Sequence, residues 1–115
     1  MIDDFVNAHA SDAGAWRVTL SVQAAPGTTR TALVSRPVGN KLVERLVKPD
    51  AYVDGEYGCV GTPLHIEIVR GAASLPLDVD CGHLYLSAHG HDGPWVTLSP
   101  DMVQFIDGIR ATVLP

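Results

Sequence analysis

Three of the five histidines lie between residues 83 and 91, and the last two of them could bind a metal ion. His89 and His91 are two residues apart, and Asp92 follows directly. Imidazole nitrogens and carboxylate oxygens are ligands that zinc, nickel and copper accept. Because the segment is rich in turn-forming residues, these ligands would make a weak, open site unless another strand completed it. We favour the alternative, which is a solvated hairpin loop.

A second combination, Cys81 and His83, could supply a nucleophile and its base. Such a pair needs the imidazole within hydrogen-bond reach of the sulfur. Residues two apart in an extended strand are too far from each other, so the pair fails unless Gly82 bends the chain. We therefore expect a buried cysteine and an exposed histidine without a catalytic role.

Two pairs of carboxylates are spaced so that each pair shares one face of a strand, namely Asp54 with Glu56 and Asp78 with Asp80. Together they could hold Mg²⁺ or Ca²⁺, or act as an acid and a base. In an acidic protein such pairs more often keep an exposed strand soluble and prevent edge-to-edge pairing. We predict that these four residues contact a basic partner.

Motifs of the common enzyme classes are missing from the sequence. It contains no GxSxG, HExxH or GxxxxGK pattern, and the basic segment after Arg36 lacks the second helix of a helix-turn-helix. We therefore expect a protein that is not an enzyme and that needs no cofactor.

Short strands and helices would hold these residues. Alternating apolar residues predict strands over residues 16–23, 29–35, 64–70, 75–79, 83–88 and 95–98. Helical spacing predicts helices over residues 2–10 and 40–47, the second capped by Asn40, and a third that begins at Ser99. Pro76 has no N–H to donate, so its strand should lie at an edge or pair poorly. The predicted core of the last third is Leu84, Leu86, Val96, Leu98, Val103 and Ile106.

This pattern predicts a single α+β domain over residues 1–115. Its antiparallel sheet should have five to seven strands, with two or three short helices packed mainly on one face. Residues 50–61 should form an irregular loop with a short strand near 57–60.

Charge is distributed unevenly along this acidic chain, whose net charge is −5. Residues 30–48 contain five bases and one acid, whereas residues 50–107 contain nine acids and one base. An acidic chain is poorly suited to nucleic acid, because phosphates require cations. We expect the two segments to neutralise each other across the folded surface. The alternative is that the acidic half faces a basic partner.

The first residues are acidic rather than basic, and no run of about 20 apolar residues occurs. We therefore expect a soluble, cytoplasmic protein that does not bind membranes. Cys59 and Cys81 should then be reduced thiols.

The leading hypothesis is a small acidic binding protein that is not an enzyme and acts through a protein–protein interface in residues 50–92. An immunity protein or antitoxin that neutralises a basic toxin or nuclease is one version, since opposite potentials speed association. One alternative is a small-ligand or metal-binding protein that uses the loop from His89 to Asp92. The other is a self-assembling structural subunit, for example phage-encoded, which the charged fraction of 18% favours. A homo-oligomer is compatible with all three.

Overall fold

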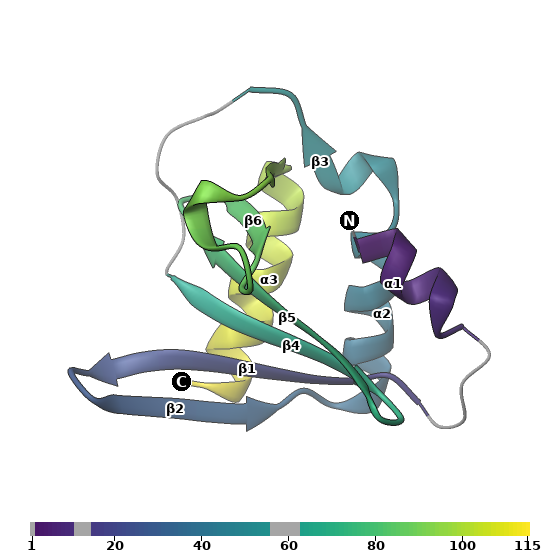
Figure 1. Ribbon diagram of the computed structural model, residues 1–115. Coiled ribbons are helices and arrows are strands. Elements are labelled where there is room, and N and C mark those ends of the chain that lie inside the picture. Colours follow the sequence, from purple (N-terminus) through teal and green to yellow (C-terminus); the bar gives the residue numbers. More distant parts are fainter. Residues whose placement is uncertain (1, 11–14, 56–62) are drawn as a thin grey trace.

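An antiparallel sheet with helices on one side makes up the fold, as seen in a computed structural model that describes residues 2–10, 15–55 and 63–115 (Figure 1). Within these ranges seven strands lie in the order β2-β1-β4-β5-β6-β7-β3. The strands are β1 (Arg17–Ala25), β2 (Thr28–Leu33), β3 (Tyr52–Val53), β4 (Leu64–Arg70), β5 (Ala73–Asp80), β6 (His83–Leu86) and β7 (Trp95–Leu98). The predicted α+β class with an antiparallel sheet is confirmed.

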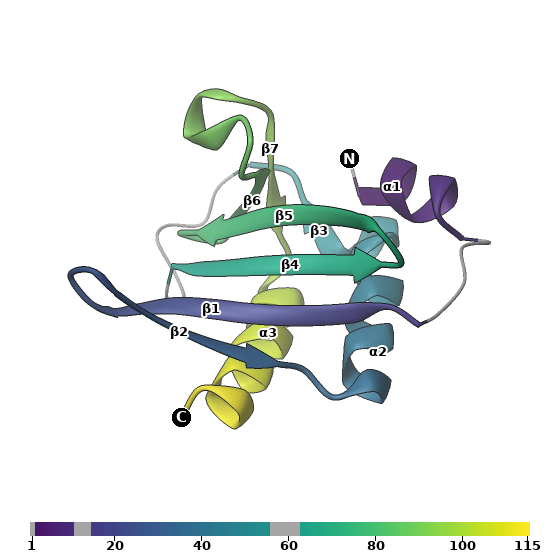
Figure 2. The same cartoon turned by 60° about the horizontal axis from the view of Figure 1, so that its bottom comes forward.

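The helices are α1 (Ile2–Ala8), α2 (Arg36–Leu46) and α3 (Pro100–Val113), with 3₁₀ turns η1 (Pro49–Ala51) and η2 (Gly90–Asp92). Figures 1 and 2 show α2 and α3 on the same face of the sheet, with α1 beside one end of it. None of the helices in the described part of the chain has the length and apolar character of a membrane span.

The core lies between the sheet and α2 and α3. Alternate residues of each central strand point into it, which explains why Leu20, Ile66 and Leu77 are fully buried. Six core residues were predicted for the last third of the chain. Four of them are buried, namely Leu84, Leu98, Val103 and Ile106. The other two, Leu86 and Val96, are partly buried and pack against the core.

The prediction that the strand of Pro76 lies at an edge or pairs poorly is wrong, because β5 lies between β4 and β6 and pairs with both. The carbonyl of Pro76 accepts a hydrogen bond from the Ser87 N–H at 3.1 Å, just beyond Leu86, where β6 ends. The N–H and C=O of a strand residue point to the same side, so the missing N–H also faces the end of β6. The proline therefore costs the ladder no regular hydrogen bond.

Helix α2 begins earlier than predicted, after Ser35 rather than at Asn40. Pro37 lies in the first turn, where its missing N–H has no helical partner to lose. Gly39 also continues the helix, and a Cβ built on it would lie 3.3 Å from Cγ2 of Val18. This glycine therefore lets the helix approach β1 closely.

The predicted start of α3 is confirmed. The Ser99 hydroxyl accepts a hydrogen bond from the Met102 N–H at 3.1 Å, and Pro100 occupies the first turn. The helix continues through Gly108 to Val113.

The segment predicted as an irregular loop contains strand β3, which pairs with β7 at the sheet edge. Its Tyr52 hydroxyl donates a hydrogen bond to the carbonyl of Leu46 at the end of α2. The short strand predicted near 57–60 lies outside the described residues.

Candidate functional site

Among the described residues, no α-helix covers one face of the sheet, and this face gathers most of the polar and aromatic side chains of the strands. Its residues alternate along the strands with those that face α2 and α3, so they point away from these helices, although Tyr85 and Thr97 among them are buried. We call this surface the open face and define it by Ser21, His65, Glu67, Asp78, Asp80, His83, Tyr85, Trp95 and Thr97.

Five residues of the open face form one row across five strands. The strand registers pair Ser21 with His65, His65 with Asp78, Asp78 with Tyr85, and Tyr85 with Trp95. Directly opposed residues in antiparallel strands have neighbouring side chains, so the row brings a hydroxyl, an imidazole, a carboxylate and two aromatic rings side by side.

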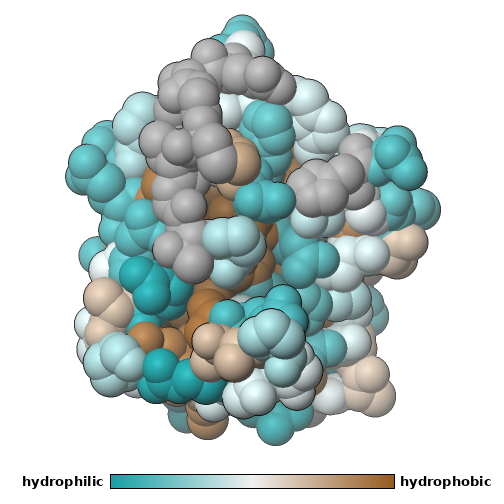
Figure 3. All heavy atoms as spheres, turned by 90° about the vertical axis from the view of Figure 1, so that its left-hand side faces the viewer, coloured by the Kyte–Doolittle hydropathy of each residue, from teal (hydrophilic) through white to brown (hydrophobic). Residues whose placement is uncertain are grey.

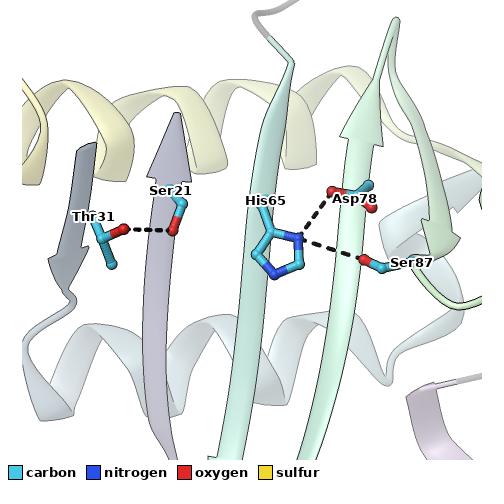
Figure 4. Close-up of polar contacts among 5 residues, drawn as sticks. All are labelled: Ser21, Thr31, His65, Asp78 and Ser87. Atoms are coloured by element: carbon cyan, nitrogen blue, oxygen red, sulfur yellow. Dashed lines mark hydrogen bonds and ion pairs between the residues drawn. The ribbon is translucent and has the colours of Figure 1, made fainter. Parts of the chain in front are cut away.

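The centre of this row is a hydrogen-bonded pair, shown in Figure 4. Nδ1 of His65 lies 2.9 Å from Oδ1 of Asp78, and Oγ of Ser87 lies 3.4 Å from the same nitrogen. In a Ser-His-Asp triad the serine must reach the other imidazole nitrogen, Nε2. Because both contacts fall on Nδ1, this cluster does not activate the serine. Asp78 instead orients the ring and leaves Nε2 to face outward.

A hollow of about 420 Å³ adjoins this pair. It is lined by polar groups of the open face, including Ser21 and Asp80, and by apolar groups such as Val22 and Leu64. Figure 3 faces the side of the molecule where β1 ends and β4 begins, and it shows hydrophobic side chains recessed between hydrophilic ones. The hollow could receive a partner's side chain, although its mixed lining specifies no small ligand.

The electrostatic character of the open face is negative over β4 to β7, whereas the exposed Arg17 at the start of β1 places one cation on the same side of the sheet. Burial raises the pKa of the Tyr85 hydroxyl, and the carboxylates of Asp78 and Asp80 raise it further. Among the outward residues of β4 to β7 there is no lysine or arginine, whereas Glu67 adds a third carboxylate. A cation approaching this surface would therefore be attracted.

Trp95 is the most exposed aromatic ring of the open face. Its side chain is 43% exposed, and its ring stacks on that of His83 at 4.0 Å between centroids, with 21° between the planes. A stacked, preordered tryptophan loses little conformational freedom when a partner covers it. Trp95 is thus a suitable anchor for an interface.

The structure separates the acids predicted to bind a partner. Asp78 and Asp80 lie together on β5, but Asp54 follows β3, with β6 and β7 between them. Glu56 lies outside the described residues. The backbone next to Asp54 is fixed, because the Thr97 hydroxyl donates to the carbonyl of Gly55 at 2.7 Å.

The metal hypothesis for His89, His91 and Asp92 stays a prediction. The three residues lie at and within η2, and the side chains of His89 and Asp92 are exposed, whereas that of His91 is not described. Across the described residues, no group of three His, Cys, Asp or Glu side chains is placed to hold a metal ion. A titration with Zn²⁺ or Ni²⁺ that is followed by thermal stability would test the site.

Cys81 is disulfide-bonded, so the prediction of a reduced thiol is wrong for this residue, while Cys59 lies outside the described residues. Cys81 and Gly82 both have positive φ, at 52° and 77°, and form the two-residue turn between Asp80 and His83. The chain does bend at Gly82, but a disulfide sulfur is not a free nucleophile.

The neutralisation of the two charged segments across the folded surface stays a prediction. Within the described residues, no base of residues 30–48 forms an ion pair with an acid of residues 50–107; Lys48 instead pairs with Glu44 of its own segment at 3.4 Å. Arg30 lies opposite Val22 on the helix side and donates to the carbonyl of Pro115 at 2.9 Å. The bases and the open-face acids therefore lie on opposite sides of the sheet.

Sequence reasoning missed the pair of His65 and Asp78. The signal was the turn at Gly71 and Ala72, which leaves Arg70 opposite Ala73. A two-residue turn fixes the register of both strands, and counting back from it places His65 opposite Asp78.

No protein-family model, no curated protein and no solved structure matches this chain.

Proposed function

We propose that this protein is a binding protein without enzymatic activity, whose open face contacts a basic surface of another protein. The observation that carries the proposal is the combination of three carboxylates and two aromatic rings on one helix-free face. The carboxylates belong to Glu67, Asp78 and Asp80, and the rings to Trp95, which is exposed, and Tyr85, which is only 8% exposed. Opposite potentials speed and orient association, and aromatic residues supply much of the affinity of interfaces.

The geometry of His65 and Ser87 supports binding rather than catalysis. Both polar contacts fall on Nδ1 of the imidazole, so the serine has no base. A fixed imidazole beside a carboxylate can still accept and donate hydrogen bonds at an interface. A neutraliser of a cationic toxin or nuclease, of the immunity or antitoxin type, is the version of this function that the charges favour.

Charge reversal on the open face tests the proposal. We would compare the wild type with the double variant Glu67→Lys and Asp80→Lys, and with Asp101→Lys and Asp107→Lys on α3 as a control of equal charge. Each would serve as bait in an extract of the source cells at low salt, and the captured protein would be purified for titration calorimetry. We expect a basic protein to bind the wild type and the α3 variant, and the open-face variant to bind at least about 100-fold more weakly.

Equal affinity of the two double variants would refute the open face as the interface. Failure to capture any basic protein would refute the partner's proposed chemistry. The single variant Asp54→Lys would show whether the edge at β3 belongs to the same interface.

A cytoplasmic location belongs to the proposal, and Cys81 provides its test. Disulfides are rare in cytosolic proteins, so the redox state of Cys81 in living cells distinguishes the cytoplasm from an oxidising compartment. Acid quenching followed by thiol labelling measures this directly. A disulfide already present at the moment of quenching would rule out the cytoplasm in favour of an oxidising compartment.

A further inference from the structure

A second surface lies on the helix side of the sheet, where an apolar groove of about 570 Å³ runs between α2, α3 and the end of β2. The residues that shape it are Leu33, Val34, Val38, Phe105, Gly108 and Ile109. No charged side chain lines the groove among the described residues. The groove is therefore lined mainly by apolar side chains, and Ser35, Gln104 and Thr112 are its polar members.

Two features keep this groove open. Gly108 has no side chain, and a Cβ built on it would meet nothing within 4 Å. Leu33, the last residue of β2, also borders the groove, but its register opposite Thr19 turns its side chain toward the open face, so this side chain does not fill the groove. A helix interior gains stability from alanine over glycine, so a glycine that packs against nothing is locally unfavourable and leaves space for another molecule.

Cations border one end of the groove. The guanidinium of Arg45 lies 4.4 Å from the centroid of the Phe105 ring, and Nζ of Lys41 lies 5.7 Å from it. Neither residue has a carboxylate partner among the described residues. Arg36 adds a third cation at the start of α2, beside the groove residue Ser35. The Phe105 ring holds the charges of Arg45 and Lys41 close to the apolar floor of the groove.

We infer that this groove binds an acidic peptide segment whose apolar side chains enter it. The open shape along two helices suits a peptide, since helix-in-groove recognition uses apolar anchors from one side of a segment. The uncompensated cations of α2 complement carboxylates on the segment's polar side. The groove and the open face lie on opposite sides of the sheet and prefer opposite charges. The protein thus has a second binding surface, independent of the proposed contact with a basic partner.

Fluorescence anisotropy with two synthetic peptides tests the inference. Both have about 14 residues with leucine at helical spacing, and their polar positions are all glutamate in one and all lysine in the other. We expect the glutamate peptide to bind wild-type protein saturably, at least about tenfold more tightly than the lysine peptide. Absence of saturable binding, or equal binding of the two peptides, would overturn the proposal.

Variants of Gly108 localise the binding. Gly108→Leu fills the groove without burying a polar group and should weaken binding of the glutamate peptide at least about tenfold. Gly108→Ala is the matched control, which gains the same helix propensity but should bind within about twofold of wild type. Circular dichroism would confirm that both variants are folded. Unchanged binding by Gly108→Leu would show that the groove is not the site.

Charge variants test the acidic preference. Lys41→Glu at the groove should weaken binding of the glutamate peptide about tenfold, whereas Lys48→Glu, at the far end of α2, should change it little. Equal effects of the two substitutions would show that the peptide responds only to the net charge of the protein, and would refute the groove site.

A second copy of the chain could fill the groove instead of a peptide, and light scattering of unliganded protein at high concentration tests this. A dimer that Gly108→Leu dissociates would show that a second copy of the chain fills the groove, against the inference.

Discussion

Replacing Tyr52 by phenylalanine should destabilise the protein at neutral pH but make its stability less sensitive to alkaline pH. Tyr52 lies in the edge strand β3, and its hydroxyl donates to the carbonyl of Leu46, the last residue of α2. The bond joins the helix layer to the edge of the sheet next to β7, the strand that carries Trp95. Removal of the hydroxyl leaves the ring packing intact and deletes this connection.

The expected loss at pH 7 follows from the one hydrogen bond involved. A partly buried bond between neutral groups contributes about 1 kcal/mol, and the carbonyl at a helix end can regain water when its donor is removed. We therefore expect the Tyr52→Phe variant to be about 1 kcal/mol less stable. In a chain of this size that lowers the melting temperature by roughly 4 °C.

The alkaline behaviour follows from the pKa of the same hydroxyl. Burial, and to a lesser extent the charge of Asp3, raises the pKa of Tyr52 from its ordinary value of 10.0 to about 12. A raised pKa means that the folded state holds the proton more tightly. The stability that the protonated Tyr52 hydroxyl contributes to the folded state is fully present below pH 10 and is lost as the pH rises toward 12. The full contribution would be about 2.7 kcal/mol, but water reaches the half-buried ring, so we expect about 1 kcal/mol.

Urea unfolding of both proteins at several pH values from 7 to about 11.5 measures the effect. The difference in unfolding free energy should be about 1 kcal/mol at pH 7 and should approach zero at the alkaline end. Titration of phenolate absorbance would show one late-ionising group lost in the variant. A difference that stays constant with pH, or a variant as stable as wild type at pH 7, would refute the reasoning.

Four further outcomes are expected from the fold. Ser99→Ala removes the cap that accepts from Met102 and should lower the unfolding free energy by about 1 kcal/mol in urea titrations. Gly39→Val places methyl groups against Val18 and should lower it by roughly 1–3 kcal/mol, with a lower melting temperature in calorimetry. Gly108→Ala, which meets nothing within 4 Å, should raise it by about 0.5–1 kcal/mol in the same experiment. Reduction of the disulfide at Cys81 should lower stability by about 2–4 kcal/mol, seen as a lower urea midpoint in dithiothreitol.

Periodicity predicted the regular elements well because it reports burial directly. The strand from Arg17 alternates in sequence, and so its Val18 and Leu20 are fully buried. The start of α3 was predictable because Ser99 and Pro100 each satisfy a local requirement of a helix N-terminus. Both signals are complete within a few residues of sequence.

The wrong predictions concern residues whose effect depends on what lies beside them. Pro76 would disrupt a central strand if its missing N–H faced a full neighbour, but β6 ends at Leu86. Pro37 and Gly39 resemble helix breakers in isolation, yet one lies in the first turn and the other is where α2 meets β1. The sequence around these residues does not show how long the neighbouring strand is or how closely a helix approaches a strand.

The candidate site was predicted in part, because its residues come from several strands. Asp78 and Asp80 were identified from their spacing, which one strand fixes. The partner of Asp78 is His65 on another strand, and Trp95 completes the row from a third. Such a row depends on the register of every pair of neighbouring strands. Of these registers, only that of β4 and β5, which the turn at Gly71 fixes, can be predicted from the sequence.

The charge distribution shows how the fold turns a linear pattern into two surfaces. The basic segment forms an edge strand and then α2, so its cations lie on the helix side of the sheet. The acids of β4 and β5 alternate with core residues, so they point to the other side. Among the described residues, the sheet separates the bases of α2 from the acids of β4 and β5, whereas Asp101 and Asp107 of α3 lie on the same side as those bases. Two opposite surfaces on one small domain predict that binding of a basic protein and of an acidic peptide would weaken together as salt rises, yet be lost separately by substitutions on opposite sides of the sheet.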